Sequence, residues 1–230
     1  MNIHCCSFAS ESFEKKQKLQ AKHLLKIGFD SNKIHLYNPK RLNRNFYELQ
    51  PNASEENKFG WFTFKPFMIL SILEEIDQGD ILLYLDVNDK PLYGIKSYLE
   101  KFFIENNAID ILGILGNYPN ISFLSRFHRS NLSKELLLSS LFNFQPEAGV
   151  ISVKNTPKAK SLLFSWYYLT LNQAYDLDIF FDRRSRHDQE TLFLLSRIYK
   201  AIRLESWFLY KLTGNGIRKY IDFEYFRKNI

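Results

Sequence analysis

Cysteine is scarce in this chain of 230 residues, which has only Cys5 and Cys6. They are neighbours in an apolar segment that is typical of a first strand, where packing side by side is favoured over a disulfide or a metal site. This fits a reducing, cytoplasmic location. No apolar run approaches the roughly 20 residues that a membrane span requires. The first ten residues lack a basic start and lead into a charged segment, so they are not typical of a secretory signal.

Several common catalytic motifs are also absent. The sequence contains no Gly-rich phosphate loop, no Ser nucleophile elbow, no HExxH and no paired CxxC. The segment CSFASES at 6–12 has no glycine, whereas a nucleotidyltransferase that makes sugar nucleotides would normally carry a Gly-rich loop after its first strand. That class of enzyme is therefore disfavoured. Without an internal repeat or a flexible linker, we expect one domain at 1–203 and a tail at 204–230.

Positive charge is concentrated at the C-terminus. The formal net charge is +6, and residues 197–230 hold eight Lys or Arg against three acidic residues. Basic residues interleaved with aromatics favour an anionic membrane surface or nucleic acid, and they also fit a solvated basic helix packed on the core. We expect the tail to contact the inner face of the inner membrane, and a non-enzymatic nucleic-acid-binding protein is the competing hypothesis.

Apolar segments of strand and helix type alternate along the chain. Strands are predicted at 2–8, 33–37, 81–85, 109–115 and 148–153, and helices at 11–27, 66–77, 134–142, 156–173 and 188–202. This alternation predicts an α/β fold: an open, mostly parallel mixed sheet flanked by helices, of the Rossmann-like kind. In such sheets ligands bind beyond the carboxyl ends of the strands.

The segment GDILLYLDVND at 79–89 places Asp86, Asn88 and Asp89 directly after a fully apolar strand. A hard divalent cation such as Mg²⁺ or Mn²⁺ prefers oxygen ligands of this kind, and it can bridge the phosphates of a nucleotide sugar. The same residues also fit a loop in which Asp and Asn cap the next turn. Carboxylates at a strand end would repel the phosphates of nucleic acid unless a cation intervened, which argues against the nucleic-acid hypothesis.

An aromatic cluster at 58–66 contains Trp61 and ends in Lys65, just before a predicted helix. A helix start favours anions, so Lys65 is a candidate phosphate ligand. The alternative is a hydrophobic staple with a surface lysine.

Two further segments carry polar residues at element ends. In RRSRHDQ at 183–189, Asp188 can cap a helix, His187 can contact metal, phosphate or sugar, and Asp188 with Gln189 can bind sugar hydroxyls. A capped helix with a basic loop is the simpler reading. Glu147 precedes Ala148-Gly149 and a buried strand; it is a candidate base or acceptor ligand, and Gly149 could let a ligand approach the backbone.

In this order, these segments resemble a family of bacterial glycosyltransferases associated with lipopolysaccharide and capsule synthesis. Members look like GYWxWKP, then GDIxxYxD, then AGI, then HDQ; the counterparts here are 60–66, 79–86, 148–150 and 187–189. The resemblance covers most of the first 200 residues and leaves the tail outside. It implies a GT-A-type enzyme that uses a nucleoside-diphosphate sugar donor and a glycan or lipid-linked glycan acceptor.

The chain is more loosely similar to retaining galactosyltransferases and glycogenins, whose domains carry DxD, then FNxGV, then DQ. Asp86, the segment 144–150 and Asp188 match in order, but Asn88 stands where the second Asp of DxD would be. This likeness places Asp86 near the ribose and metal and leans towards retention. The expected roles are metal ligands Asp86 with Asn88 or Asp89, donor contacts Trp61, Lys65 and His187, sugar ligands Asp188 and Gln189, and acceptor-side carboxylate Glu147.

Overall fold

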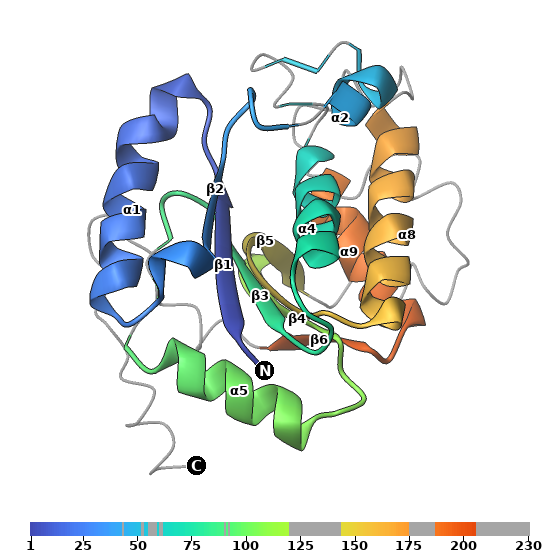
Figure 1. Cartoon of the computed structure of the whole chain (residues 1–230). Coiled ribbons are helices and arrows are strands. Elements are labelled where there is room, and N and C mark those ends of the chain that lie inside the picture. The colour runs from blue at the N-terminus through green and yellow to red at the C-terminus, as the bar shows by residue number, and fades with distance from the viewer. Residues whose placement is uncertain are drawn as a thin grey trace.

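The computed structural model describes residues 1–42, 44–51, 53–54, 59, 62–89, 91, 93–119, 144–174 and 187–205. The strands are β1 (Ile3–Phe8), β2 (Ile34–Tyr37), β3 (Ile81–Leu85), β4 (Ile111–Pro119), β5 (Phe144–Lys154) and β6 (Ile202–Glu205). The helices are α1 (Glu14–Lys26), α2 (Arg44–Leu49), α4 (Phe64–Glu75), α5 (Ile95–Glu105), α8 (Pro157–Ala174) and α9 (His187–Ile198), with short 3-10 turns at Glu11–Phe13 and Ser31–Lys33. Figure 1 shows the sheet between two groups of helices.

The described strands form one six-stranded sheet in the order β2-β1-β3-β5-β4-β6. β1 is parallel to β2 and β3, β4 is parallel to β6, and β5 is antiparallel to both of its neighbours, β3 and β4. Three of the five pairings are therefore parallel, which confirms the predicted α/β fold with an open, mostly parallel mixed sheet.

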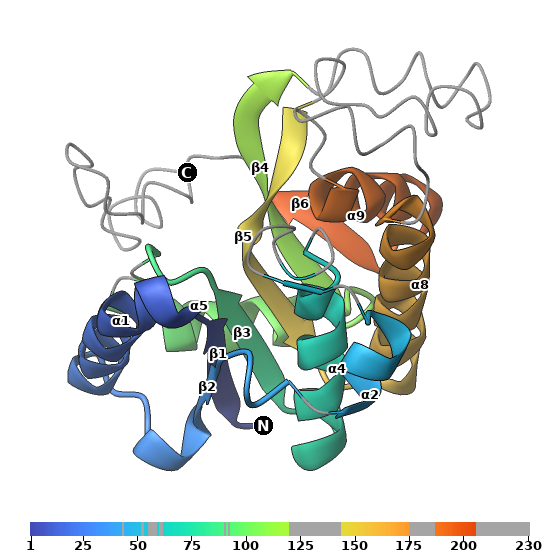
Figure 2. The same ribbon diagram turned by 90° about the horizontal axis from the view of Figure 1, so that it is seen from above.

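The central strand β3 is buried on both faces. Its side chains alternate: Leu82 and Tyr84 lie in the core beneath α4, α8 and α9, and Ile81, Leu83 and Leu85 lie in the core beneath α1 and α5. Figure 2 shows these two groups of helices on opposite sides of the sheet. A strand covered on both faces has a continuous run of apolar residues. The first polar residue after this run therefore marks the carboxyl end of the strand.

The structure corrects two sequence predictions about elements and adds one helix. The helix predicted at 188–202 ends at Ile198, and Ile202–Glu205 form β6, because this segment pairs in parallel with β4 at the edge of the sheet. α4 begins at Phe64, so Pro66 is its third residue rather than its first. α5 was not predicted.

The two cysteines do not pack side by side as expected. Cys5 belongs to the core beneath α1 and α5 and Cys6 to the core beneath α4, because successive side chains of a strand point to opposite faces. Both thiols are free and fully buried, and burial raises the pKa of each, with the neighbouring Cys5 adding to the effect on Cys6. They are therefore core residues without thiolate character at neutral pH.

Two expectations concern regions outside this description. The helix predicted at 134–142 and residues 206–230 of the basic tail lie outside the described residues. β6 itself includes Leu204 and Glu205, beyond the expected domain end at residue 203. Among the described helices, none is both long enough and apolar enough to cross a membrane.

A histidine pair joins β1 to β2 near Asp80, which directly precedes β3. His4 Nδ1 lies 3.1 Å from His35 Nε2, and His4 Nε2 lies 3.3 Å from Asp80 Oδ2. Burial, and then the positive charges of His4 and Arg41, lower the pKa of His35 from 6.5 to about 4. His35 is therefore neutral in the folded protein at neutral pH.

The free energy of unfolding should consequently fall as the pH is lowered from 6.5 towards about 4, because the unfolded chain binds a proton at His35 that the folded chain excludes. In the variant His35→Gln, the decrease in the free energy of unfolding over this pH range should be smaller by about 1 to 2 kcal/mol. This value allows for screening by solvent, because the ring is only half-buried. Urea denaturation of both proteins at about pH 7 and about pH 5 measures it. An unchanged pH dependence in the variant would assign the effect to other groups.

Candidate active site

The first polar residues after β3 form a tight turn. The backbone N–H of Asp86 donates to the carbonyl of Gly149 on β5 at 2.7 Å, and the N–H of Asp89 donates to the carbonyl of Asp86 at 2.8 Å. The turn 86–89 is thus joined to the neighbouring strand and closed on itself. It lies at the carboxyl end of β3, the end at which open α/β sheets bind their ligands.

Two carboxylates of this turn converge on Gly149. A Cβ at this position would lie 2.8 Å from Asp89 Oδ2 and 3.2 Å from Asp86 Oδ2. The space that any other residue would fill is therefore taken by the two carboxylate oxygens. This corrects the expectation that Gly149 leaves room for a ligand at the backbone: the groups that approach it belong to the chain itself.

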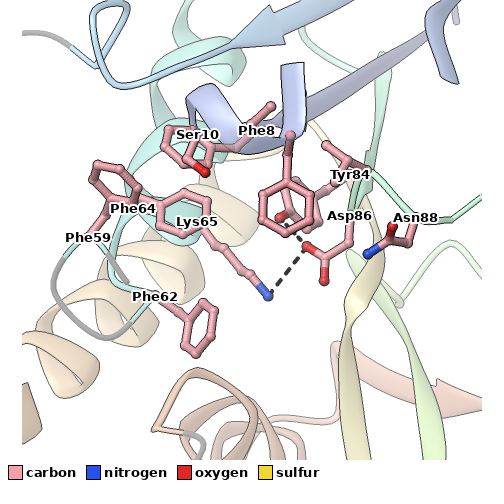
Figure 3. A pocket seen from close by; sticks show the side chains of 12 residues that line it. Phe8, Ser10, Phe59, Phe62, Phe64, Lys65, Tyr84, Asp86 and Asn88 are labelled. Carbon is pink, nitrogen blue, oxygen red and sulfur yellow. Dashed lines mark hydrogen bonds and ion pairs between the residues drawn. The ribbon is translucent and has the colours of Figure 1, made fainter. Parts of the chain in front are cut away.

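A buried lysine from the first turn of α4 joins this carboxylate group. Lys65 is 4% exposed, and its Nζ lies 3.0 Å from Asp188 Oδ2, which belongs to a side chain 2% exposed. The same Nζ lies 3.6 Å from Asp86 Oδ1 and donates to the carbonyl of Ala148 at 3.2 Å. Figure 3 shows the Lys65 side chain directed at Asp86. α4, β3, β5 and α9 therefore meet in one charged cluster.

The protonation states in this cluster follow from its geometry. Burial lowers the pKa of Lys65, but the carboxylates of Asp188, Asp86 and Asp89 together outweigh burial and raise it above its ordinary value. Burial, followed by the charge of Asp86 and the hydrogen bond to it, raises the pKa of Tyr84 well above its ordinary value. Lys65 is thus an ammonium ion at neutral pH. The Tyr84 hydroxyl stays protonated and donates a hydrogen bond to Asp86 Oδ1.

The two candidates for the second oxygen ligand differ in their surroundings. Asn88 is exposed, and its Oδ1 accepts a hydrogen bond of 3.0 Å from Lys16 Nζ. Figure 3 shows it on the side of Asp86 away from Lys65. Asp89 is 5% exposed and faces the same point as Asp86. The geometry therefore favours Asp89 over Asn88 as the residue that would bind a cation together with Asp86.

No group of three or more His, Cys, Asp or Glu side chains within the described part of the chain is arranged to hold a metal ion. Two carboxylates still fit Mg²⁺ or Mn²⁺, because such ions are commonly held by one or two carboxylates, water and the phosphates of the substrate. The pair Asp86 and Asp89 has the oxygen donors that this kind of binding uses.

Gln20, which was not among the residues predicted from the sequence, holds the turn from the side of α1. Its Nε2 donates to the carbonyls of both Asp86 and Asp89 at 2.7 Å, and its side chain is fully buried in α1. Gln17, one turn earlier, donates in the same way to the carbonyls of Ser7 and Tyr37. The sequence contained one signal for this role: Gln17 and Gln20 are spaced i, i+3 and lie on the same face of α1 as the buried Leu24.

Replacing Gln20 with methionine should lower the free energy of unfolding by about 1 to 3 kcal/mol, because two carbonyls of the turn lose their donor. It should also weaken the nucleotide binding that the sequence predicts, because the turn carries Asp86 and Asp89. The matched variant Gln17→Met should be destabilised by a similar amount without the effect on binding. Urea denaturation and nucleotide titration of both variants test this. If Gln17→Met weakened nucleotide binding equally, Gln20 would have no specific role in positioning the turn.

An aromatic pocket opens beside Lys65 and Asp86. Phe59 and Phe62 have positive φ values of 52° and 72°, which are uncommon for bulky side chains and store strain in this segment. The Phe62 ring centre lies 4.9 Å from Lys65 Nζ, a cation–π contact. The lining residues are Phe8, Ala9, Ser10, Phe13, Phe59, Phe62, Phe64, Lys65, Tyr84, Asp86, Val87 and Asn88. The pocket thus combines apolar walls with one charged side (Figure 3).

The other residues predicted for the site lie in α9, in β5 or outside the described residues. Asp188 is the second residue of α9, so it does not cap the helix as expected; its carbonyl accepts from Trp166 Nε1 at 2.8 Å. Gln189 follows it and is 7% exposed. His187 begins α9 and Glu147 lies in β5, but their side chains are outside the description, and Trp61 is outside the described residues.

Comparison with known proteins establishes the fold class of the chain. No family model matches the sequence, and no curated protein matches it. Mouse xyloside xylosyltransferase 1, solved in its apo form, has a TM-score of 0.54 at 11% identity, covering 90% of this chain and 86% of that chain. The galactosyltransferase LgtC, solved with donor and acceptor sugar analogues, has a TM-score of 0.53 at 11% identity, covering 90% and 74%. The chain therefore has a GT-A-like fold.

Proposed function

We propose that this chain is a glycosyltransferase that moves a sugar from a nucleoside-diphosphate sugar to a hydroxyl group of a cell-surface glycan. The observation that carries the proposal is the convergence of Asp86 and Asp89 on Gly149, beside the buried ammonium of Lys65 and the aromatic pocket. Two sugar transferases have the same fold. The resemblance of the sequence motifs supports a lipooligosaccharide or capsule acceptor, either a glycan or a lipid-linked glycan.

In the proposed reaction, the bond between the sugar C1 and the diphosphate oxygen breaks, and its electron pair stays on the diphosphate. The oxygen of the acceptor hydroxyl forms the new bond to C1, and its proton is released. The protein contributes mainly by positioning the two substrates and by stabilising the charge that develops on the diphosphate.

Asp86 and Asp89 are assigned as the ligands of a divalent cation, Mn²⁺ or Mg²⁺. When bound, this ion supplies positive charge next to the diphosphate. Asp89 is preferred to Asn88 because its carboxylate shares the space over Gly149 with Asp86, whereas the Asn88 amide is bonded to Lys16. Tyr84 and the turn's hydrogen bonds hold Asp86 in place.

The aromatic pocket is assigned to the nucleoside, because its phenylalanine walls suit a flat base and it borders Asp86. Trp61 is proposed as a further residue that binds the donor nucleotide. Lys65 and His187 are proposed to lie on the phosphate side. For Lys65 the ion pairs add a second role, since they fix the positions of Asp188 and Asp86.

The sugar and acceptor sides are assigned to α9 and β5. Asp188 and Gln189 are proposed to hold the donor sugar; the 3.0 Å ion pair between Asp188 and Lys65 places this carboxylate next to Asp86. Glu147 is proposed as the acceptor-side carboxylate, because it is close in sequence to Gly149, where Asp86 and Asp89 converge.

Thermal unfolding with UDP-, GDP-, CMP- and ADP-linked nucleotides, with and without Mn²⁺, tests the proposal. A ligand that binds only the folded state stabilises it by about 2.7 kcal/mol at a hundredfold excess over its Kd. One nucleotide should raise the melting temperature with Mn²⁺, and Asp86→Asn should lose the rise while Asp77→Asn, an exposed residue before β3, keeps it. If no nucleotide stabilises the protein, the proposal is contradicted and the basic nucleic-acid-binding protein is favoured.

A further inference from the structure

The outer face of α1 carries a dense group of positive charges. The helix has five lysines and one glutamate within Glu14–Lys26. Four exposed lysines form this outer face: Lys15, Lys18, Lys22 and Lys26. Among the residues that the structure describes, no carboxylate forms an ion pair with any of these four. Their charge is therefore available to an external partner.

Apolar side chains are exposed on the same helix. Leu19 is 53% exposed and lies one helical turn from Lys15 and Lys22, and Leu25 is 47% exposed. The opposite face is fixed to the protein, because Gln17 and Gln20 are buried there with hydrogen bonds to strand and turn carbonyls. Figure 1 shows α1 on the outside of the molecule. The outer face thus combines lysines with leucines on a rigid support.

We propose that this face of α1 binds the surface of an anionic lipid bilayer. Clusters of four to eight basic residues on an amphipathic helix are attracted by anionic headgroups. This attraction falls off with distance from the membrane surface over about one Debye length. A soluble polyanion would use the lysines alone, whereas a bilayer also takes up exposed leucines at the level of its headgroups. The pattern of charge and leucine therefore matches a membrane surface.

The helix α1 borders the pocket. Phe13, which directly precedes α1, is part of the pocket lining, and Lys16 on α1 donates to Asn88 at its rim. A bilayer bound to α1 would hold the pocket close to a lipid-linked acceptor. Only this consequence rests on the proposed glycosyl transfer; binding to lipid is measured without nucleotide or acceptor, so the two can fail separately.

Co-sedimentation of the full chain with phosphatidylcholine vesicles, with and without phosphatidylglycerol, tests the proposal. Binding should require phosphatidylglycerol, and Lys18→Glu with Lys22→Glu should reduce it at least about tenfold. The control Lys40→Glu with Lys101→Glu makes the same change in net charge at exposed lysines elsewhere and should bind nearly as the parent does. Circular dichroism checks that both variants are folded.

The leucine provides the second arm of the test. Leu19→Gln should reduce binding about fivefold and leave a greater share of it sensitive to salt, because the apolar contribution is lost. Equal vesicle binding by the two double variants would overturn the proposal and assign any affinity to overall charge or to other segments. Unchanged binding of Leu19→Gln would also overturn it, in favour of a soluble polyanion as the partner.

Discussion

Replacing Lys65 with methionine should lower the free energy of unfolding by about 3 to 5 kcal/mol, because it leaves the carboxylate of Asp188 buried without its cation. Asp188 is 2% exposed, so water cannot take over the role of the ammonium group. Nucleotide-dependent activity should be lost as well, since Asp86 loses the same partner. Urea denaturation and nucleotide release measure the two effects.

Two variants control this result. Lys160→Met removes a surface ion pair with Glu74 and should change stability by no more than about 1 kcal/mol. The double variant Lys65→Met with Asp188→Asn should recover much of the lost stability, because the unpaired buried charge is then gone. Activity should not return, since both proposed site residues are altered. If the double variant were as unstable as Lys65→Met, the loss would come from packing rather than from the ion pair.

Replacing Gly149 with alanine should reduce cation-dependent nucleotide binding by about 10- to 100-fold, comparable to the loss of a metal-orienting contact. The new Cβ would lie 2.8 Å from Asp89 Oδ2 and 3.2 Å from Asp86 Oδ2, so both carboxylates must move apart. Their ends can swing, so the cost in stability should stay within the about 1 to 3 kcal/mol typical of overpacking. Titration of Mn²⁺ and nucleotide measures the effect on binding.

Gly113→Ala on the adjacent strand β4 is the matched control. There the new Cβ would meet Leu204 Cδ2 at the same distance, 2.8 Å, but it would touch no carboxylate. This variant should lose a similar amount of stability and keep its nucleotide affinity. Equal loss of binding in both variants would mean that Gly149 acts through the sheet as a whole and not through Asp86 and Asp89.

The sheet and the position of Asp86 could be predicted because they depend on local patterns. β3 was predicted with its observed bounds, since a strand buried on both faces is a continuous apolar run that ends at its first carboxylate. α5 was missed although Ile95, Leu99 and Phe103 recur at i, i+4 and i+8. β6 could not be distinguished from the end of α9, because its extended conformation is set by pairing with β4.

The composition of the site depended on contacts that the sequence does not specify. Asp86 and Asp188 were proposed separately, and the ion pairs of Lys65 with both appear only once α4, β3 and α9 are packed together. Gly149 meets Asp86 because β5 inserts antiparallel beside β3, an arrangement that alternation of strands and helices does not predict. The role of Gln20 likewise requires the position of α1 over the turn.

The most direct test of glycosyl transfer is the release of free nucleoside diphosphate from a panel of nucleotide sugars, with Mn²⁺ or Mg²⁺ and a lipooligosaccharide acceptor. We expect release from one donor class, increased by the acceptor, and lost in both Asp86→Asn and Gly149→Ala while Gly113→Ala retains it. Failure to cleave any donor, or cleavage unaffected by Asp86→Asn, would contradict the assignment of this site to sugar transfer.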